Sequence, residues 1–137
     1  MLDRLREVLH RREDGVLIAT GFSFGDQHIN DVVFEALSQN PRLHAFALCF
    51  ADPAEDSDLF AASLKYTNLM LLAPTHCIVG GFKYAWSTPT LDEARASLDF
   101  MEWPADYETN FIPTSGKLKL GDFNTLSILI DSISSPE

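Results

Sequence analysis

Short apolar runs alternate with segments of helical periodicity along most of this chain, and this alternation limits the folds that it can adopt. The strand-like runs cover residues 16–20, 43–50, 69–73 and 117–120. Between them, apolar residues recur at three- and four-residue spacing, as they do on one face of a helix. Strands that alternate with helices favour a parallel sheet, and strands that are apolar throughout favour a sheet covered on both faces. We therefore predict an α/β fold, a three-layer Rossmann-like parallel sheet with helices on both faces.

Start and stop signals bound the expected helices. Asp26 stands where the N-cap of a helix over residues 27–39 belongs, and Asn40 and Pro41 end that helix. Ser57 or Asp56 can cap a further helix. The last helix is capped by Asp122, and its apolar face consists of Phe123, Leu126, Ile130 and Ile133.

Residues 76–116 fit the alternation less well and are a possible insertion into the single domain that spans residues 1–137. Strand-like residues from His76 to Trp86 are interrupted at Gly80 and Gly81, and residues 106–116 are polar and rich in turns. Large aromatic side chains concentrate here and indicate either a local core or an interface with another chain.

Composition excludes several functional classes. A formal net charge of -10 is the reverse of the balance that nucleic-acid binding requires, so backbone amides and a helix dipole would have to form any phosphate site. The 2 cysteines, in apolar runs, indicate buried thiols in a reducing compartment. No apolar stretch is long enough to cross a membrane. We expect a cytoplasmic protein that binds neither nucleic acid nor membrane, and no metal, because the histidines and cysteines lack a ligand spacing.

The segment from Gly21 to Asp26 connects an apolar strand to an amphipathic helix, which is where a nucleotide phosphate can bind. Gly21 and Gly25 permit positive φ angles or close approach of a ligand, and Ser23 can donate its hydroxyl to a phosphate or ribose oxygen. A tight turn without a ligand is an equally good interpretation of these spacings.

A serine hydrolase is a competing interpretation of the same residues. Gly21-x-Ser23-x-Gly25 also fits a nucleophile elbow, in which Ser23 is the nucleophile. The triad would be completed by His76 and by one of three acids, Asp52, Asp56 or Asp58. Only one strand candidate precedes Ser23, which leaves little chain for the oxyanion hole that this chemistry needs.

The longer string Gly21-Phe22-Ser23-Phe24-Gly25-Asp26-Gln27-His28-Ile29-Asn30-Asp31 resembles closely the motif of SIR2-like proteins, the sirtuin-related family that includes bacterial antiphage NAD hydrolases. The similarity extends through the following helix and strand and returns at residues 118–123. It implies the carboxy-terminal half of an NAD-binding domain, with NAD or ADP-ribose as the ligand. The residues that it implies at the ligand are Gly21, Phe22, Ser23, Phe24, Asp26, His28, Gly121, Asp122 and Phe123.

Asp52 is a further candidate, because an acid at the end of the second strand can accept hydrogen bonds from ribose hydroxyls. No catalytic residue is expected: in the family, the glycine-rich loop and the Asn and His that promote cleavage precede the motif, and residues 1–15 contain no such loop and no suitable Asn. We expect His28 to cap or contact the neighbouring loop, Asn30 to be an exposed helix residue, and His44 and His76 to lie at strand edges.

Two functional classes follow from this. The chain is either a nucleotide-binding fragment or subunit of a SIR2-like NAD-consuming system, inactive by itself, or an interaction protein that keeps the fold without the ligand. If an amino-terminal half is absent, the sheet has an open edge, so we expect a homo-oligomer or a protein partner that supplies that half.

Overall fold

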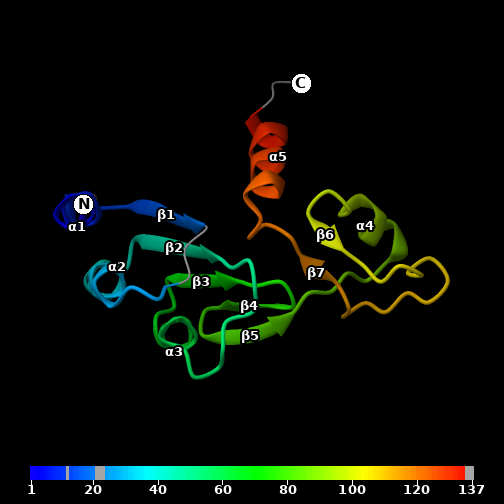
Figure 1. Ribbon diagram of the computed structural model, residues 1–137, viewed down its shortest axis with the longest axis horizontal. Helices are drawn as coiled ribbons and strands as arrows, with labels where there is room; N and C mark the ends of the chain where they lie inside the picture. Colours follow the sequence, from blue (N-terminus) through cyan, green and yellow to red (C-terminus); the bar gives the residue numbers. More distant parts are fainter. Residues whose placement is uncertain (12, 21–23, 135–137) are drawn as a thin grey trace.

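The computed structural model describes residues 1–11, 13–20 and 24–134, which form a mixed α/β fold. Figure 1 labels its elements in chain order. They are α1 (Leu2–Arg11), β1 (Gly15–Thr20), α2 (Gln27–Gln39), β2 (Leu43–Leu48), α3 (Asp58–Lys65), β3 (Leu69–Leu72), β4 (His76–Val79), β5 (Phe82–Ala85), α4 (Leu91–Ala96), β6 (Met101–Glu102), β7 (Lys117–Leu118) and α5 (Phe123–Ser134).

Five strands form the main sheet in the order β1-β2-β3-β4-β5. Strands β1, β2 and β3 are parallel, and each crosses to the next through a helix. Strands β4 and β5 are antiparallel, so the expectation of a parallel sheet is wrong for this part. The reason is the connection between them: Gly80 and Gly81, with φ of 61° and 84°, make a two-residue hairpin turn, whereas a parallel crossover needs a dozen residues or more.

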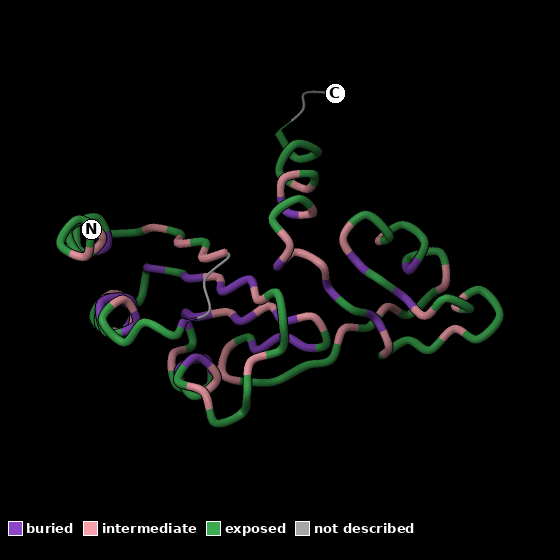
Figure 2. Tube along the Cα trace, in the orientation of Figure 1, coloured by how far each residue is buried: buried purple, intermediate pink, exposed green. Residues whose placement is uncertain are grey.

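One face of the sheet carries the hydrophobic core. Leu17, Ala45 and Leu69 lie side by side in register and pack, with their neighbours two residues further along each strand, against helices α1, α2 and α3. Figure 2 shows the buried residues gathered between the sheet and these helices. The main core residues are Leu9, Val32, Val33, Ala36, Leu37, Leu59, Ala62, Leu71 and Ile78.

The opposite face is open at the β1 side of the sheet. Val16 and Ile18 point to this face and are 65% and 54% exposed. Phe46 and Met70, the register partners of Ile18, are only partly buried. Among the described residues, no helix covers these four side chains, so the helical layer that we expected on this face is not seen.

A second, smaller core lies beyond the far end of the sheet. Ala94, Met101, Trp103 and Leu118 are buried together, where β6 and β7 form a two-stranded antiparallel sheet. The Trp86 indole Nε1 donates to the carbonyl oxygen of Ala73 at 2.7 Å and ties this unit to the main sheet. Most aromatic side chains of this region therefore belong to a local core, one of the two alternatives that its sequence left open, whereas Phe82 and Tyr84 on β5 are exposed.

Helix α5 stands out from the rest of the molecule (Figure 1). Within the described part of the chain, no helix is both long and apolar enough to cross a lipid bilayer.

Candidate functional site

The connection from β1 to α2 is anchored by its helix cap. Asp26 has the extended backbone of an N-cap residue, and its carboxylate accepts from the backbone N–H groups of His28 at 2.9 Å and Ile29 at 3.4 Å. The predicted cap is thus confirmed. The His28 side chain is exposed. The other ligand candidates of this segment, Gly21, Phe22 and Ser23, lie outside the described residues.

Phe24 fixes the end of this connection to the core. It is buried, has a left-handed φ of 54°, and its ring stacks on Phe34 with a centroid distance of 6.4 Å. Asn30 donates from Nδ2 to the Phe24 carbonyl oxygen at 2.7 Å. The expectation that Asn30 is exposed is wrong: it is 1% exposed, because its position on α2 faces inward, toward the chain that leaves β1.

Two buried polar atoms near this connection have no hydrogen-bond partner among the described residues. They are Oδ1 of Asn30 and Oγ1 of Thr20, the last residue of β1. A buried acceptor without a donor costs free energy, so a polar group brought to this end of β1 would find acceptors already in place.

The segment from Gly121 to Phe123 lies over the end of β2. A Cβ atom built on Gly121 would collide with the carbonyl group of Cys49, so only glycine allows this approach. The Asp122 carboxylate accepts from the backbone N–H of Thr125 at 3.3 Å and from its hydroxyl at 3.0 Å, which caps α5 as predicted. Phe123 is exposed.

A shallow pocket of about 210 Å³ opens at this point. Gly121 and Asp122 form one side of it and Cys49 and Phe50 another. Its remaining lining residues are Pro74, Glu102, Lys117, Leu118 and Lys119. Lys117 and Lys119 are not among the ligand residues predicted from the sequence, although Lys119 lies within the 118–123 segment that resembles the family.

Asp52 holds the turn between β3 and β4. Its carboxylate accepts from the backbone N–H of Thr75 at 3.0 Å and from the Thr75 hydroxyl at 2.8 Å. The nearest His76 atom, Nδ1, lies 3.7 Å from the same carboxylate. Both oxygens of Asp52 are therefore already used within the chain.

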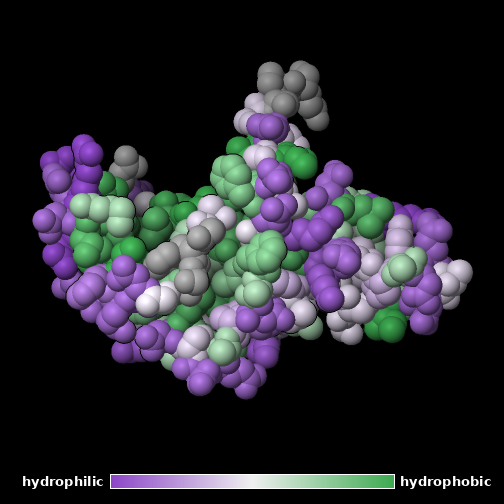
Figure 3. Space-filling view, in the orientation of Figure 1, coloured by the Kyte–Doolittle hydropathy of each residue, from purple (hydrophilic) through white to green (hydrophobic). Residues whose placement is uncertain are grey.

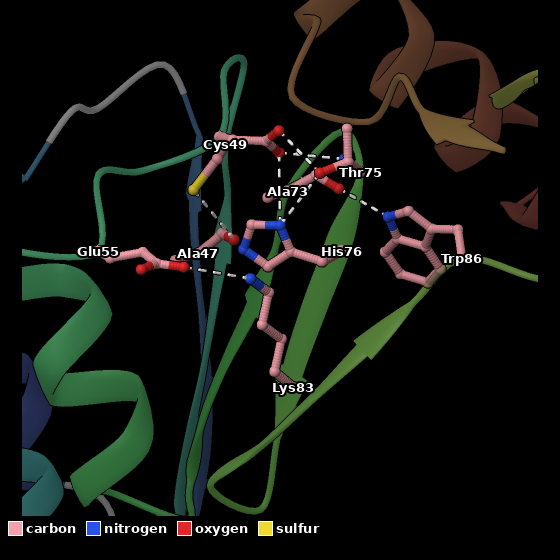
Figure 4. Close-up of polar contacts among 9 residues, drawn as sticks. Ala47, Cys49, Glu55, Ala73, Thr75, His76, Lys83 and Trp86 are labelled. Atoms are coloured by element: carbon pink, nitrogen blue, oxygen red, sulfur yellow. Dashed lines mark hydrogen bonds and ion pairs between the residues drawn. The ribbon is translucent and has the colours of Figure 1, made fainter. Parts of the chain in front are cut away.

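His76 is buried, although we expected it at a strand edge. Figure 4 shows its ring among Cys49, Thr75 and Lys83, and among the described residues its Nε2 atom has no hydrogen-bond partner. Burial lowers the pKa of His76, the ammonium group of Lys83 lowers it further, and the Asp52 carboxylate opposes both. Protonation of the ring is therefore disfavoured in the folded chain.

Cys49 is not an activated nucleophile. Burial raises the pKa of its thiol to about 11, and the nearby Asp52 carboxylate acts in the same direction. Its Sγ donates weakly to the Ala47 carbonyl oxygen at 3.9 Å. Since the thiolate is the reactive form, this thiol has a structural role.

The structure thus brings some of the predicted residues together. The end of β1, the end of β2 and the 121–123 segment lie at one edge of the sheet, since Thr20 is the register partner of Leu48 and Gly121 contacts Cys49. His28 is instead a surface residue of α2. Comparison with known proteins adds no assignment: no family model matches the chain, and no curated protein is significantly similar to it.

Proposed function

We propose that this chain binds NAD or ADP-ribose as the carboxy-terminal half of a SIR2-like nucleotide-binding domain, and that it is inactive by itself. One observation carries the proposal. Two sequence segments resemble the family, residues 21–31 and 118–123, and both adjoin the carboxyl edge of the parallel strands. The first follows Thr20, the last residue of β1 and the register partner of Leu48, and Gly121 of the second contacts Cys49 after β2. In open α/β sheets this edge is where nucleotides bind.

Two lysines at this edge can contact an anionic ligand. Lys117 and Lys119 line the pocket beside Gly121, together with the acidic residues Glu102 and Asp122. The Lys119 ammonium group donates to the Leu98 carbonyl at 3.3 Å, and Lys117 is exposed. Lys117 is therefore the better placed to reach a phosphate.

The pocket accommodates only part of a dinucleotide. Ligand pockets usually measure about 300 to 1,000 Å³, whereas this one measures about 210 Å³. We infer that it takes one end of the ligand and that the 21–26 segment contacts the phosphates. Asp52 would have to release Thr75 before it could bind ribose hydroxyls, so we assign it to the turn instead.

We also propose that the complete domain has a Rossmann-like three-layer arrangement. Such an arrangement requires a further layer of helices on the open face beside Val16 and Ile18. A partner that supplies this layer would be part of a NAD-consuming system, such as the antiphage systems to which the motif is similar.

Calorimetric titration with NAD and with ADP-ribose tests the proposal. We expect saturable heat that is lost in Ser23→Trp and weakened at least about tenfold in Lys117→Glu, which corresponds to one desolvated charge contact. Lys65→Glu, on the exposed side of α3, is the matched control and should bind like the unaltered chain. Absence of saturable heat with both nucleotides would overturn the proposal and leave the interaction protein.

One observation favours a second candidate, the serine hydrolase. Asp52 and His76, two of its proposed triad residues, are neighbours at 3.7 Å, and the lowered pKa of His76 favours the neutral ring that a general base needs. Both Asp52 oxygens bind Thr75, however, so the carboxylate does not orient the ring. Covalent labelling of Ser23 by a fluorophosphonate would establish the hydrolase, and an unlabelled chain would exclude it.

A further inference from the structure

Helix α5 has an apolar stripe that the described part of the chain covers only at its base. Phe123, Leu126, Ile130 and Ile133 recur at the three- and four-residue spacing of one helical face. Leu126 is buried, whereas Ile130 and Ile133, one and two turns further along the same face, are 50% and 74% exposed. An amphipathic helix gains its stability by burying such a face, so the α5 stripe lacks a partner.

The open face of the sheet also exposes apolar side chains, and it lacks a covering helix. Val16 and Ile18 on β1 lie beside Phe46 on β2, and β1 is one of the two edge strands of the described sheet, β5 being the other. Figure 3 shows apolar surface around β1, between α1 and the base of α5. An apolar sheet face without a covering layer is the surface on which a helix packs in α/β proteins.

The chain exposes more surface area than a compact monomer of its mass. The chain exposes 8688 Å². A compact monomer of its mass, 15.3 kDa, exposes about 7,100 Å², which leaves an excess of about 1,500 Å². A stable interface of standard size buries about 800 Å² on each partner. The excess is thus more than one such interface requires.

Two copies of this chain can associate only where their contact surfaces lack acidic side chains. Each copy has a net charge of -10, so two copies repel each other at long range, and a dimer has to be held by apolar contact. The α5 sequence FNTLSILIDSIS contains one acidic residue, Asp131, and it lies outside the stripe. The strand residues of the open face are Val16, Ile18, Thr20, His44, Phe46, Leu48, Met70 and Leu72, and none of these is Asp, Glu, Lys or Arg. Asp14 and Arg42 lie at the edge of the face, beside Val16 and His44.

We propose that two copies of this chain associate reciprocally, the α5 stripe of each packing on the open β1 face of the other. A single twofold symmetric interface then buries both the α5 stripe and the open β1 face of each copy, because the helix and the sheet face belong to the same chain. The second copy would then supply the layer that the proposed function requires on the open face, and the association itself does not depend on nucleotide binding.

Sedimentation equilibrium of the full chain tests the association. We expect twice the chain mass of 15.3 kDa at micromolar concentration. Ile130→Glu should weaken the dimer at least about a hundredfold, because it places a carboxylate in an apolar contact. Asn124→Glu adds the same charge on another side of α5 and should leave the dimer intact, and circular dichroism should show that both variants are folded. A monomeric unaltered chain overturns the proposal.

Cross-linking distinguishes reciprocal docking from other arrangements. A tagged Val16→Cys chain mixed with an Ile133→Cys chain should give a mixed dimer with a short bismaleimide, and the yield should fall when Ile130→Glu is added. If only the doubly substituted chain cross-links, and does so within itself, α5 folds back on its own sheet and the proposal is wrong. Cross-linking between Val16→Cys chains alone would indicate pairing of β1 edges and would also overturn it.

Discussion

Gly121 lies so close to the carbonyl group of Cys49 that no side chain fits between them. This contact joins the last part of the chain to the end of β2 and forms one wall of the candidate nucleotide pocket.

Substitution of Gly121 by alanine should therefore destabilise the fold. The new Cβ would meet backbone atoms, which cannot rotate away, and we expect a loss of about 3 kcal/mol or more in the free energy of unfolding. Denaturant unfolding measures it. Gly15→Ala is the control, since its Cβ would meet only the Leu43 side chain at 3.6 Å and should cost little. Equal stability of the two variants would contradict the close contact.

Replacement of Asn68 by alanine or by aspartate should destabilise the fold. Its Nδ2 group donates to the carbonyl oxygens of Leu37 at 3.0 Å, Asn40 at 3.2 Å and Leu43 at 2.9 Å, and thereby ties the end of α2 to β2. Asn68→Asp replaces this donor by a carboxylate facing three acceptors, and we expect it to cost about 3 kcal/mol or more.

Asn68→Ala, which removes the donor without adding charge, should cost less than Asn68→Asp. Thr67→Ala, at the exposed neighbouring position, should stay within about 0.5 kcal/mol of the unaltered chain. Thermal unfolding followed by circular dichroism ranks the stabilities of the three variants. An Asn68→Asp variant as stable as the Asn68→Ala variant would contradict the role of the three Asn68 hydrogen bonds.

Stability should fall in mild acid because of His76. Its pKa is lowered in the folded chain and returns to the ordinary value of 6.5 on unfolding. The unfolded chain therefore binds more protons between these two pKa values. The free energy of unfolding should decline as the pH drops through about 6.5, by at most about 1.4 kcal/mol per pH unit, and level off below the folded pKa.

Chemical denaturation at several pH values in the unaltered chain and in His76→Gln measures this component. The variant should lose it, whereas His44→Gln, which alters an exposed residue of β2, should retain it. An unchanged pH dependence in His76→Gln would assign the effect to other groups.

Substitutions of Asp26 distinguish a structural role of this residue at the start of α2 from a role in ligand binding. Asp26→Ala removes the cap and should cost about 1 kcal/mol, while Asp26→Asn keeps an acceptor and should be nearly neutral. If Asp26 also contacts the nucleotide, Asp26→Asn should lose calorimetric heat at an unchanged melting temperature. A melting temperature that falls equally in both variants would mean that the carboxylate charge, rather than the cap, matters.

Local signals in the sequence were enough for most helices and strands. Asp26 and Asp122 cap helices as their positions predicted, because a cap depends on residues two or three places away. The hairpin of β4 and β5 has a local signal as well: Gly80 and Gly81 interrupt the strand-like residues, and a two-residue connection between strands implies antiparallel pairing.

Features that depend on distant parts of the chain were not predictable. The burial of Asn30 follows from the position of the Phe24 carbonyl, and that of His76 from its neighbours on α3 and β5. Lys117 reaches the candidate pocket only because the chain returns to β2 at Gly121. The open β1 face is a tertiary property as well, since an apolar run indicates that a strand can be buried but not what buries it.

The positions of the two tryptophans allow fluorescence to show whether the two cores unfold together. Trp103 is buried in the smaller core, and Trp86 packs against it and is bonded to Ala73 at the border with the main sheet. Intrinsic fluorescence thus follows the smaller core, whereas far-ultraviolet dichroism is dominated by α1, α2, α3 and α5. The indole contact at Ala73, the hydrogen bond from the Leu118 N–H to the Pro74 carbonyl oxygen and the packing of Leu72 join the two cores. Coincidence of the two melting curves would mean that these contacts make both cores one cooperative unit, and their separation would mean that each core melts by itself.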